Sequence, residues 1–299
     1  MATKNQQGTG VSIVAPALPT APPAYNKGYL DKFNNILRLY FNQIDNALRN
    51  AVATAVPYTL RVSQGSVVGA TALYKFGTNP DIDGTEETIW TQGGNYPWPI
   101  SAALVYVSST SADDAFPSGT GARTIRVLGL DTDYNEIEED IELNGQTQVA
   151  TTKQYLRVYR AFVLTSGSGG TAAGIIYIGT SGATAGVPAV VYANLSEGNQ
   201  TQIALYTVPA GKTLYLDDIV FTAAISQANN FATVKFNTRE FGSNTFRTLV
   251  IQNIQSNANL TPFEYPLRIP EKTDIECRAV TTSTNNAVSA SFQGVLIDN

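Results

Sequence analysis

Carboxylates are the side chains of this sequence best equipped for chemistry, because its 299 residues include no histidine and one cysteine. Without histidine, Ser-His-Asp and Cys-His catalysis and His-ligated zinc are excluded. Two carboxylates about 5–9 Å apart suffice to hydrolyse a glycoside. The acidic runs at 113–114, 138–140 and 217–218 occupy β-like sequence, in which neighbouring side chains point to opposite faces of a sheet. They predict charged strand edges and no catalytic residue, so we expect a protein that is not an enzyme.

Oxygen-bearing side chains between residues 131 and 142 follow most of the calcium-loop spacing. Asp131, Asp133, Asn135 and Glu142 stand at positions 1, 3, 5 and 12 of that pattern. Position 6 requires glycine for a sharp turn and is Glu136 in this chain. Asp, Asn and Thr also stabilise turns through local hydrogen bonds. The pattern therefore favours a hairpin without an ion, and we expect no metal site.

A Gly-Lys-Thr triplet at 211–213 matches part of a phosphate-binding loop. Such a loop needs a glycine five residues before its Gly-Lys pair, where this chain has Tyr206. Pro209 and the strand-like sequence on both sides favour a turn. The single cysteine, Cys277, alternates with Ile275 and predicts a buried thiol. No nucleotide and no cofactor is expected.

Three aromatic residues share one loop with two glycines and two prolines. Trp90, Tyr96 and Trp98 would form a ligand surface if their rings were exposed, because aromatic rings stack on sugars. The glycines and prolines are equally typical of a packed irregular turn. We favour packing, and a sugar-binding surface stays open.

The charge of the chain limits its partners. The formal net charge is −5 and the sequence pI is about 4.8, so phosphate backbones and anionic lipid headgroups are repelled. No apolar run approaches the roughly 20 residues that cross a bilayer. We expect no nucleic-acid partner and no membrane insertion.

An extended arm and one long helix are predicted at the start of the chain. Residues 1–25 end in a Pro- and Ala-rich stretch that favours extended backbone. Residues 26–57 repeat apolar side chains in the 3-4 rhythm of a coiled coil and stop at Pro57. The residues expected to anchor the chain or join it to other copies are Leu30, Phe33, Leu37, Tyr40, Ile44 and Leu48.

The width of this apolar stripe exceeds a two-stranded seam, which favours a homotrimer. Docking on a partner protein, and packing along the chain's own β-rich part, remain alternatives.

The remainder of the chain has the pattern of β-structure. Short runs rich in Val, Ile, Thr, Tyr and Phe alternate with turn residues, beginning with strands at 58–63 and 67–76. This spacing is typical of antiparallel sandwiches and jelly rolls. The fold class expected is mainly β, with a first β domain at 58–195 and a second β-sandwich domain at 196–299.

Five segments of the β-rich part have a recognisable sequence: KFGTNPDID at 75–83, TIWTQGGNY at 88–96, VLGLDTDYNE at 127–136, RVYRAF at 157–162 and VPAGKT at 208–213. These segments resemble virion structural proteins of tailed bacteriophages, especially marine cyanophages of the podovirus type. Residues 23–46 also look like an N-terminal module that such phages place ahead of different β-rich bodies. The resemblance implies a capsid decoration or tail-associated protein, and it carries no catalytic residue.

We therefore expect a non-enzymatic virion protein, assembled in the host cytoplasm and held to capsid or tail proteins by its arm and helix. A tail fibre that binds a receptor or a host surface glycan is the alternative, followed by a glycan depolymerase.

Overall fold

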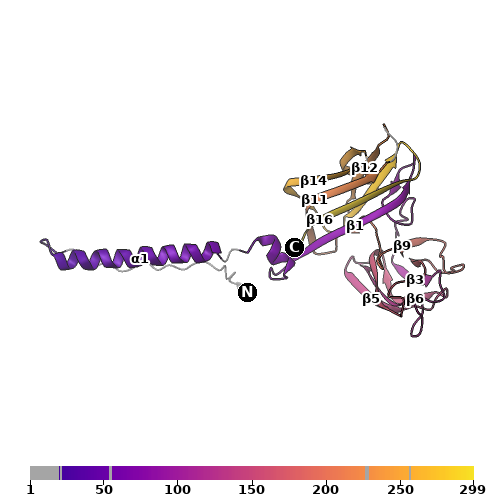
Figure 1. Ribbon diagram of the computed structural model, residues 1–299, viewed down its shortest axis with the longest axis horizontal. Coiled ribbons are helices and arrows are strands. Elements are labelled where there is room, and N and C mark those ends of the chain that lie inside the picture. Colours follow the sequence, from indigo (N-terminus) through magenta and orange to yellow (C-terminus); the bar gives the residue numbers. More distant parts are fainter. Residues whose placement is uncertain (1–19, 21, 54–55, 226–228, 256) are drawn as a thin grey trace. The chain divides into compact units, whose positions relative to one another are not determined.

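The computed structural model describes residue 20 and residues 22–53, 56–225, 229–255 and 257–299. Two compact units divide the chain, one up to Gln64 and one from Gly65 to Asn299. The expected fold class is confirmed, because antiparallel sheets make up most of the second unit (Figure 1).

Two helices lie in the described part of the first unit. Helix α1 covers Lys27–Ala53 and begins after Asn26, whose Oδ1 accepts a hydrogen bond of 3.1 Å from the backbone N–H of Tyr29. Helix α2 covers Tyr58–Ser63. No helix within the described ranges is long and apolar enough to cross a membrane.

The prediction of one helix at 26–57 and a strand at 58–63 was wrong in its second part. Pro57 ends the first helical pattern but also precedes α2, with φ −51° and ψ 142°. Proline restricts its own backbone and lacks an N–H, which suits it to the start of a helix as well as to its end. The backbone N–H of Arg61 donates to Pro57 O, which forms the first turn of α2.

A sandwich of two antiparallel sheets, here called the C-terminal sandwich, forms one part of the second unit. Its first sheet has the order β1 (Ala70–Ile82), β16 (Asn286–Asp298), β11 (Lys212–Ala224) and β14 (Ala258–Ile269). Its second sheet has the order β10 (Leu205–Thr207), β15 (Asp274–Thr281), β12 (Ala232–Arg239) and β13 (Arg247–Ile254), with β2 (Glu87–Thr88) paired to β15.

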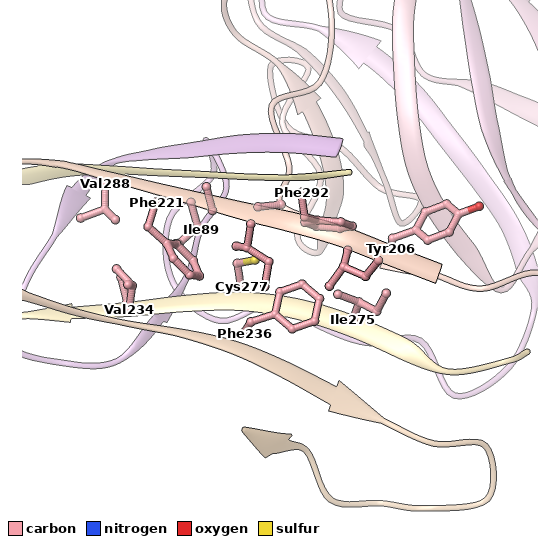
Figure 2. Packing of buried hydrophobic residues seen from close by; sticks show 14 of the residues in the cluster. Ile89, Tyr206, Phe221, Val234, Phe236, Ile275, Cys277, Val288 and Phe292 are labelled. Carbon is pink, nitrogen blue, oxygen red and sulfur yellow. The ribbon is translucent and has the colours of Figure 1, made fainter. Parts of the chain in front are cut away.

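Alternate side chains of these strands point inward and form the core. Phe236 of β12 faces Phe292 of β16 in this core (Figure 2). The two ring centroids are 5.5 Å apart, and the rings meet edge to face at 84°. Cys277 lies fully buried between the two sheets, as predicted, and burial raises the pKa of its thiol. The alternation of the sequence therefore does specify this core.

A second sandwich, here called the inserted sandwich, lies between β2 and β10 in the chain. One sheet has the order β6 (Val149–Tyr155), β3 (Ala103–Ser109), β8 (Ile176–Gly179) and β9 (Val191–Leu195). The other has the order β5 (Glu136–Glu142), β4 (Ala122–Leu130) and β7 (Arg157–Ser166). Apolar side chains of both sheets share one core.

The predicted boundaries at 58–195 and 196–299 do not follow the sheets. Strand β1 pairs with β16 along its length, from Ala70 opposite Ile297 to Ile82 opposite Asn286, and β2 pairs with β15. Strands β1 and β2, from the early part of the expected first domain, thus belong to the C-terminal sandwich. Strand pairing over more than 200 residues leaves no mark on local sequence pattern.

Candidate functional site

A cleft in the second unit is lined by turns of both sandwiches. Its volume is about 450 Å³, within the range of small-molecule sites. The turns that line it follow β4, β12 and β14 and precede β3, and the start of β7 closes it. The side chains on which its chemistry depends are Trp98, Tyr134, Arg157, Arg239, Phe241 and Lys272.

Only one of the three aromatic residues singled out in the sequence reaches this cleft. Trp90 and Tyr96 are 3% and 4% exposed, within a cluster that includes Ile203 and Leu205. Their rings meet edge to face at 5.2 Å, and Tyr96 meets Trp98 in the same way at 4.9 Å. Trp90 and Tyr96 therefore pack in the interior, as the favoured interpretation required, and cannot form a ligand surface. Half-buried Trp98 lines the cleft.

The wall of the cleft contains a buried cluster of charge. Arg157 of β7 donates from Nε and Nη2 to the two carboxylate oxygens of Asp274, at 3.0 and 3.1 Å. Arg239 of β12 donates from Nε and Nη2 to Asp274 Oδ2, at 3.1 and 2.6 Å. Thr207 Oγ1 donates to Asp274 Oδ1 at 2.6 Å. One carboxylate thus joins two guanidinium groups, and a positive charge is left over.

Aromatic rings hold the two guanidinium groups in place. Arg157 Cζ lies 5.0 Å from the ring centroid of Trp98, and Arg239 Cζ lies 5.1 Å from it. Arg239 also lies 4.6 Å from the ring of Phe246. Cation–π contacts of this kind favour a charged, oriented side chain. Trp98 Nε1 donates to Glu276 Oε2 at 3.1 Å, which fixes the indole itself.

A third cation lies over two further rings of the cleft. Lys272 Nζ is 5.7 Å from the ring centroid of Tyr134 and 5.1 Å from that of Phe241. The two rings meet edge to face at 5.7 Å. Tyr134 belongs to the turn that resembles a calcium loop, and its backbone O accepts a hydrogen bond from Ala210 N at 2.9 Å. The turn is therefore used to present an aromatic side chain.

Asp131 closes this turn with its own hydrogen bonds. Its Oδ1 accepts from the backbone N–H groups of Asp133 and Asn135, at 2.8 and 2.9 Å, and its Oδ2 accepts from Asn135 Nδ2 at 3.1 Å. Partial burial raises the pKa of Asp131, but these hydrogen bonds outweigh it and the net shift is downward. Within the described ranges, no group of three or more Cys, Asp or Glu side chains could hold a metal ion.

The acidic runs at 113–114 and 138–140 serve the fold rather than a shared site. Asp114 is buried, and its carboxylate accepts from the backbone N–H groups of Ala122, Ala173 and Gly174, while Asp113 is exposed. Asp140 pairs with Arg126 across the sheet, at 2.7 and 2.9 Å. None of these contacts brings two free carboxylates together.

The Gly-Lys-Thr triplet lies in a turn and the start of β11. Gly211 has φ +72°, as a turn requires, and Lys212 Nζ pairs with Asp298 at 3.2 Å and with Glu136 at 3.8 Å. The prediction of a turn is confirmed, and the lysine is engaged with carboxylates.

Helix α1 carries the residues predicted to anchor the chain. Phe33, Leu37, Tyr40 and Ile44 are partly exposed, and Leu48 is 58% exposed. Leu30 is exposed as well, together with Phe41 beside the apolar stripe and Leu39 on the opposite side of the helix. No side chain described between residues 22 and 48 is buried, so this helix has apolar surface available to a partner.

No family model matches the chain, and no curated protein does. Three solved structures of infectious bursal disease virus align with 81% of this chain and 78% of their own: the Gx strain at 12% identity and a TM-score of 0.22, the Gt strain at 12% and 0.18, and the VP2 subviral particle at 10% and 0.19. These TM-scores are too low for the similarity to define a fold or a function.

Proposed function

We propose that this chain is a non-enzymatic structural protein of a bacteriophage particle, a capsid decoration or tail-associated appendage assembled in the host cytoplasm as a homotrimer. Residues 1–56 attach it to other particle proteins, and the β-rich unit faces outward. The resemblance of six segments to phage virion proteins supports the particle component.

One observation carries the attachment role. Helix α1 holds apolar side chains at coiled-coil spacing, yet none of those described up to residue 48 is buried. Exposing so much apolar surface is unfavourable in water, and contact with other copies or a partner removes it from solvent. A three-stranded association covers a broader stripe than a pair of helices does.

A second candidate is a fibre that binds a host receptor or glycan. The cleft favours it, because exposed rings and cations share one depression. A glycan depolymerase has less support, since the carboxylates described above hold turns, sheet edges and the charge cluster together.

Deletion of residues 1–56 tests the attachment role. Every residue of the three hydrophobic clusters lies between 82 and 296, so the truncated chain retains its cores and should stay folded by circular dichroism. We expect the truncated chain to be absent from purified particles that incorporate the full chain. Retention of the truncated chain in particles would move the attachment site to the β-rich unit.

Substitutions inside the helix give a matched comparison. Leu37→Asp with Ile44→Asp places two charges on the apolar stripe, whereas Asn42→Asp with Asn46→Asp adds the same charge to the polar face. Only the first pair should prevent incorporation. Equal incorporation of both would contradict attachment through the stripe.

A further inference from the structure

We propose that the cleft between the two sandwiches binds an anionic saccharide, with Arg239 and Lys272 holding the acidic group and Phe241 and Tyr134 packing against the sugar ring. This inference does not rest on trimer formation or on particle attachment. It follows from hydrogen-bond donors and aromatic rings in the cleft that the ion pairs of Arg157, Arg239 and Asp274 leave unused.

Arg239 retains hydrogen-bond donors that its contacts with Asp274 do not use. A guanidinium group has five N–H donors. Arg239 uses Nε and Nη2 on Asp274, and its Nη1 makes no hydrogen bond or ion pair among the described residues. The side chain is 19% exposed and lines the cleft. The rings of Trp98 and Phe246 and the carboxylate of Asp274 fix its position, so a ligand would meet an ordered cation.

Lys272 has no carboxylate partner among the described residues. Its Nζ lies over the rings of Tyr134 and Phe241, and this side-chain nitrogen has no hydrogen bond or ion pair with another described residue, while the backbone N–H of Lys272 donates to Val208 O. Lys272 is in a turn with φ +58°, which places it between β14 and β15 at the edge of the cleft. Together with Arg239 it presents two cations to the same space.

The cleft also offers an exposed aromatic surface. Phe241 is 64% exposed, which is a high value for a phenylalanine held against Tyr134 and Lys272. The apolar face of a pyranose ring packs well on such a side chain. Hydroxyl and amide side chains also line the cleft, at Ser101, Thr132, Ser243 and Asn244, and such groups match the hydroxyl groups of a sugar.

The charges that line the cleft indicate which class of anion it suits. The cleft contains three basic side chains, Arg157, Arg239 and Lys272, and two acidic ones, Asp274 and Glu240. This small positive excess in a chain of net charge −5 suits a ligand with isolated charges and does not suit a phosphate polymer. Most lining residues lie in turns, and the edge strand β7 reaches the cleft only with its first residue, Arg157, so an extended acidic peptide has little strand edge to join.

A binding measurement on the full chain tests the proposal. Triglucuronate joined by β-1,4 bonds and cellotriose differ in their carboxylates, and 6-O-sulfated cellotriose supplies a sulfate group in the same place. Isothermal titration at about 50 mM salt should detect triglucuronate or the sulfated sugar but not cellotriose, and the tighter of the two identifies the acidic group. Absence of binding by both acidic sugars at 10 mM, or tighter binding of triglutamate, would overturn the proposal.

Substitutions place the binding in the cleft. Lys272→Gln should weaken binding about tenfold, since a charge-assisted hydrogen bond is lost. Phe241→Ser should weaken it as well. The control is Lys153→Gln, which removes the same charge from an exposed lysine of β6 and should leave the affinity unchanged. Equal effects of Lys272→Gln and Lys153→Gln would show a general charge effect and refute the assignment.

The two tryptophans give an independent readout of location. With 5-fluorotryptophan in the chain, the ¹⁹F resonance of Trp98 in the cleft should shift on adding the acidic trisaccharide, and that of buried Trp90 should not. A shift confined to Trp90, or shifts of neither residue during saturable binding, would place the ligand elsewhere.

Discussion

Replacing Asp274 with asparagine should destabilise the β-rich unit severely. The change keeps the shape of the side chain but removes the charge that both Arg157 and Arg239 contact. The side chains of Arg157 and Asp274 are 5% and 6% exposed, so solvent cannot replace the lost partner. Removing one member of a buried ion pair costs about 3–5 kcal/mol, because the remaining charge stays buried.

The melting temperature reports this loss. For a domain of this size, about 1 kcal/mol of stability corresponds to about 2–4 °C, so Asp274→Asn should lower the melting temperature by about 6–20 °C. The control is Asp140→Asn, since Asp140 also contacts an arginine with both oxygens, but the pair with Arg126 is 46% and 32% exposed. That change should have a much smaller effect, because solvent and salt screen an exposed pair.

A comparable shift for the two variants would refute the reasoning, since it would mean that burial does not determine the strength of these pairs. Calorimetric scans at the same pH and salt concentration give the comparison directly.

Three further predictions concern single groups. Burial and the nearby charge of Arg160 lower the pKa of Lys75 to about 7, so above that pH the unfolded chain binds more protons than the folded chain. The free energy of unfolding should therefore rise between pH 7 and 8.5, by at most about 1.4 kcal/mol per pH unit. Lys75→Met should abolish the accompanying rise in melting temperature. A chelator should leave the melting temperature unchanged, whereas Asp131→Ala should lower it equally with and without calcium because the turn loses its hydrogen bonds; a drop on chelation that calcium restores would reveal an ion site. Cys277 should react with a thiol reagent only after denaturation, and rapid reaction of the folded protein would contradict its burial.

The pH range of the Lys75 experiment follows from the direction of each titration. A lysine whose pKa is lowered by folding contributes instability below the folded pKa, and this penalty diminishes as pH rises toward 10.5. Above about pH 8.5 the thiol of Cys277 ionises in the unfolded chain while burial raises its pKa in the folded chain, which opposes the rise. The measurement is therefore clearest below that pH.

Local pattern predicts the strands of this protein better than their partners. The alternation in β12 and β15 places Phe236 and Cys277 in the core, where the structure has them. Strand β1 was expected at 67–76 and covers Ala70–Ile82, but its pairing with β16 depends on contacts across the whole chain. The inserted sandwich therefore could not be recognised from the spacing of strands.

The cleft shows the same limit for functional residues. Trp98 was singled out in the sequence because it shares one Gly- and Pro-containing loop with Trp90 and Tyr96. Arg239, Phe241 and Lys272 lie in or beside turns, where no periodicity marks them, and their partners are up to about 140 residues away in the chain. Their common position becomes evident only when the two sandwiches are folded together.

The mass of the full chain in solution shows whether helix α1 joins three copies of this protein. At micromolar concentration we expect a species of three times the 32.0 kDa chain mass. Leu37→Asp should convert it to a monomer, and Asn42→Asp should leave the trimer intact. A monomeric full chain would contradict self-association through α1, and an unchanged trimer in Leu37→Asp would place the contact between copies outside the apolar stripe.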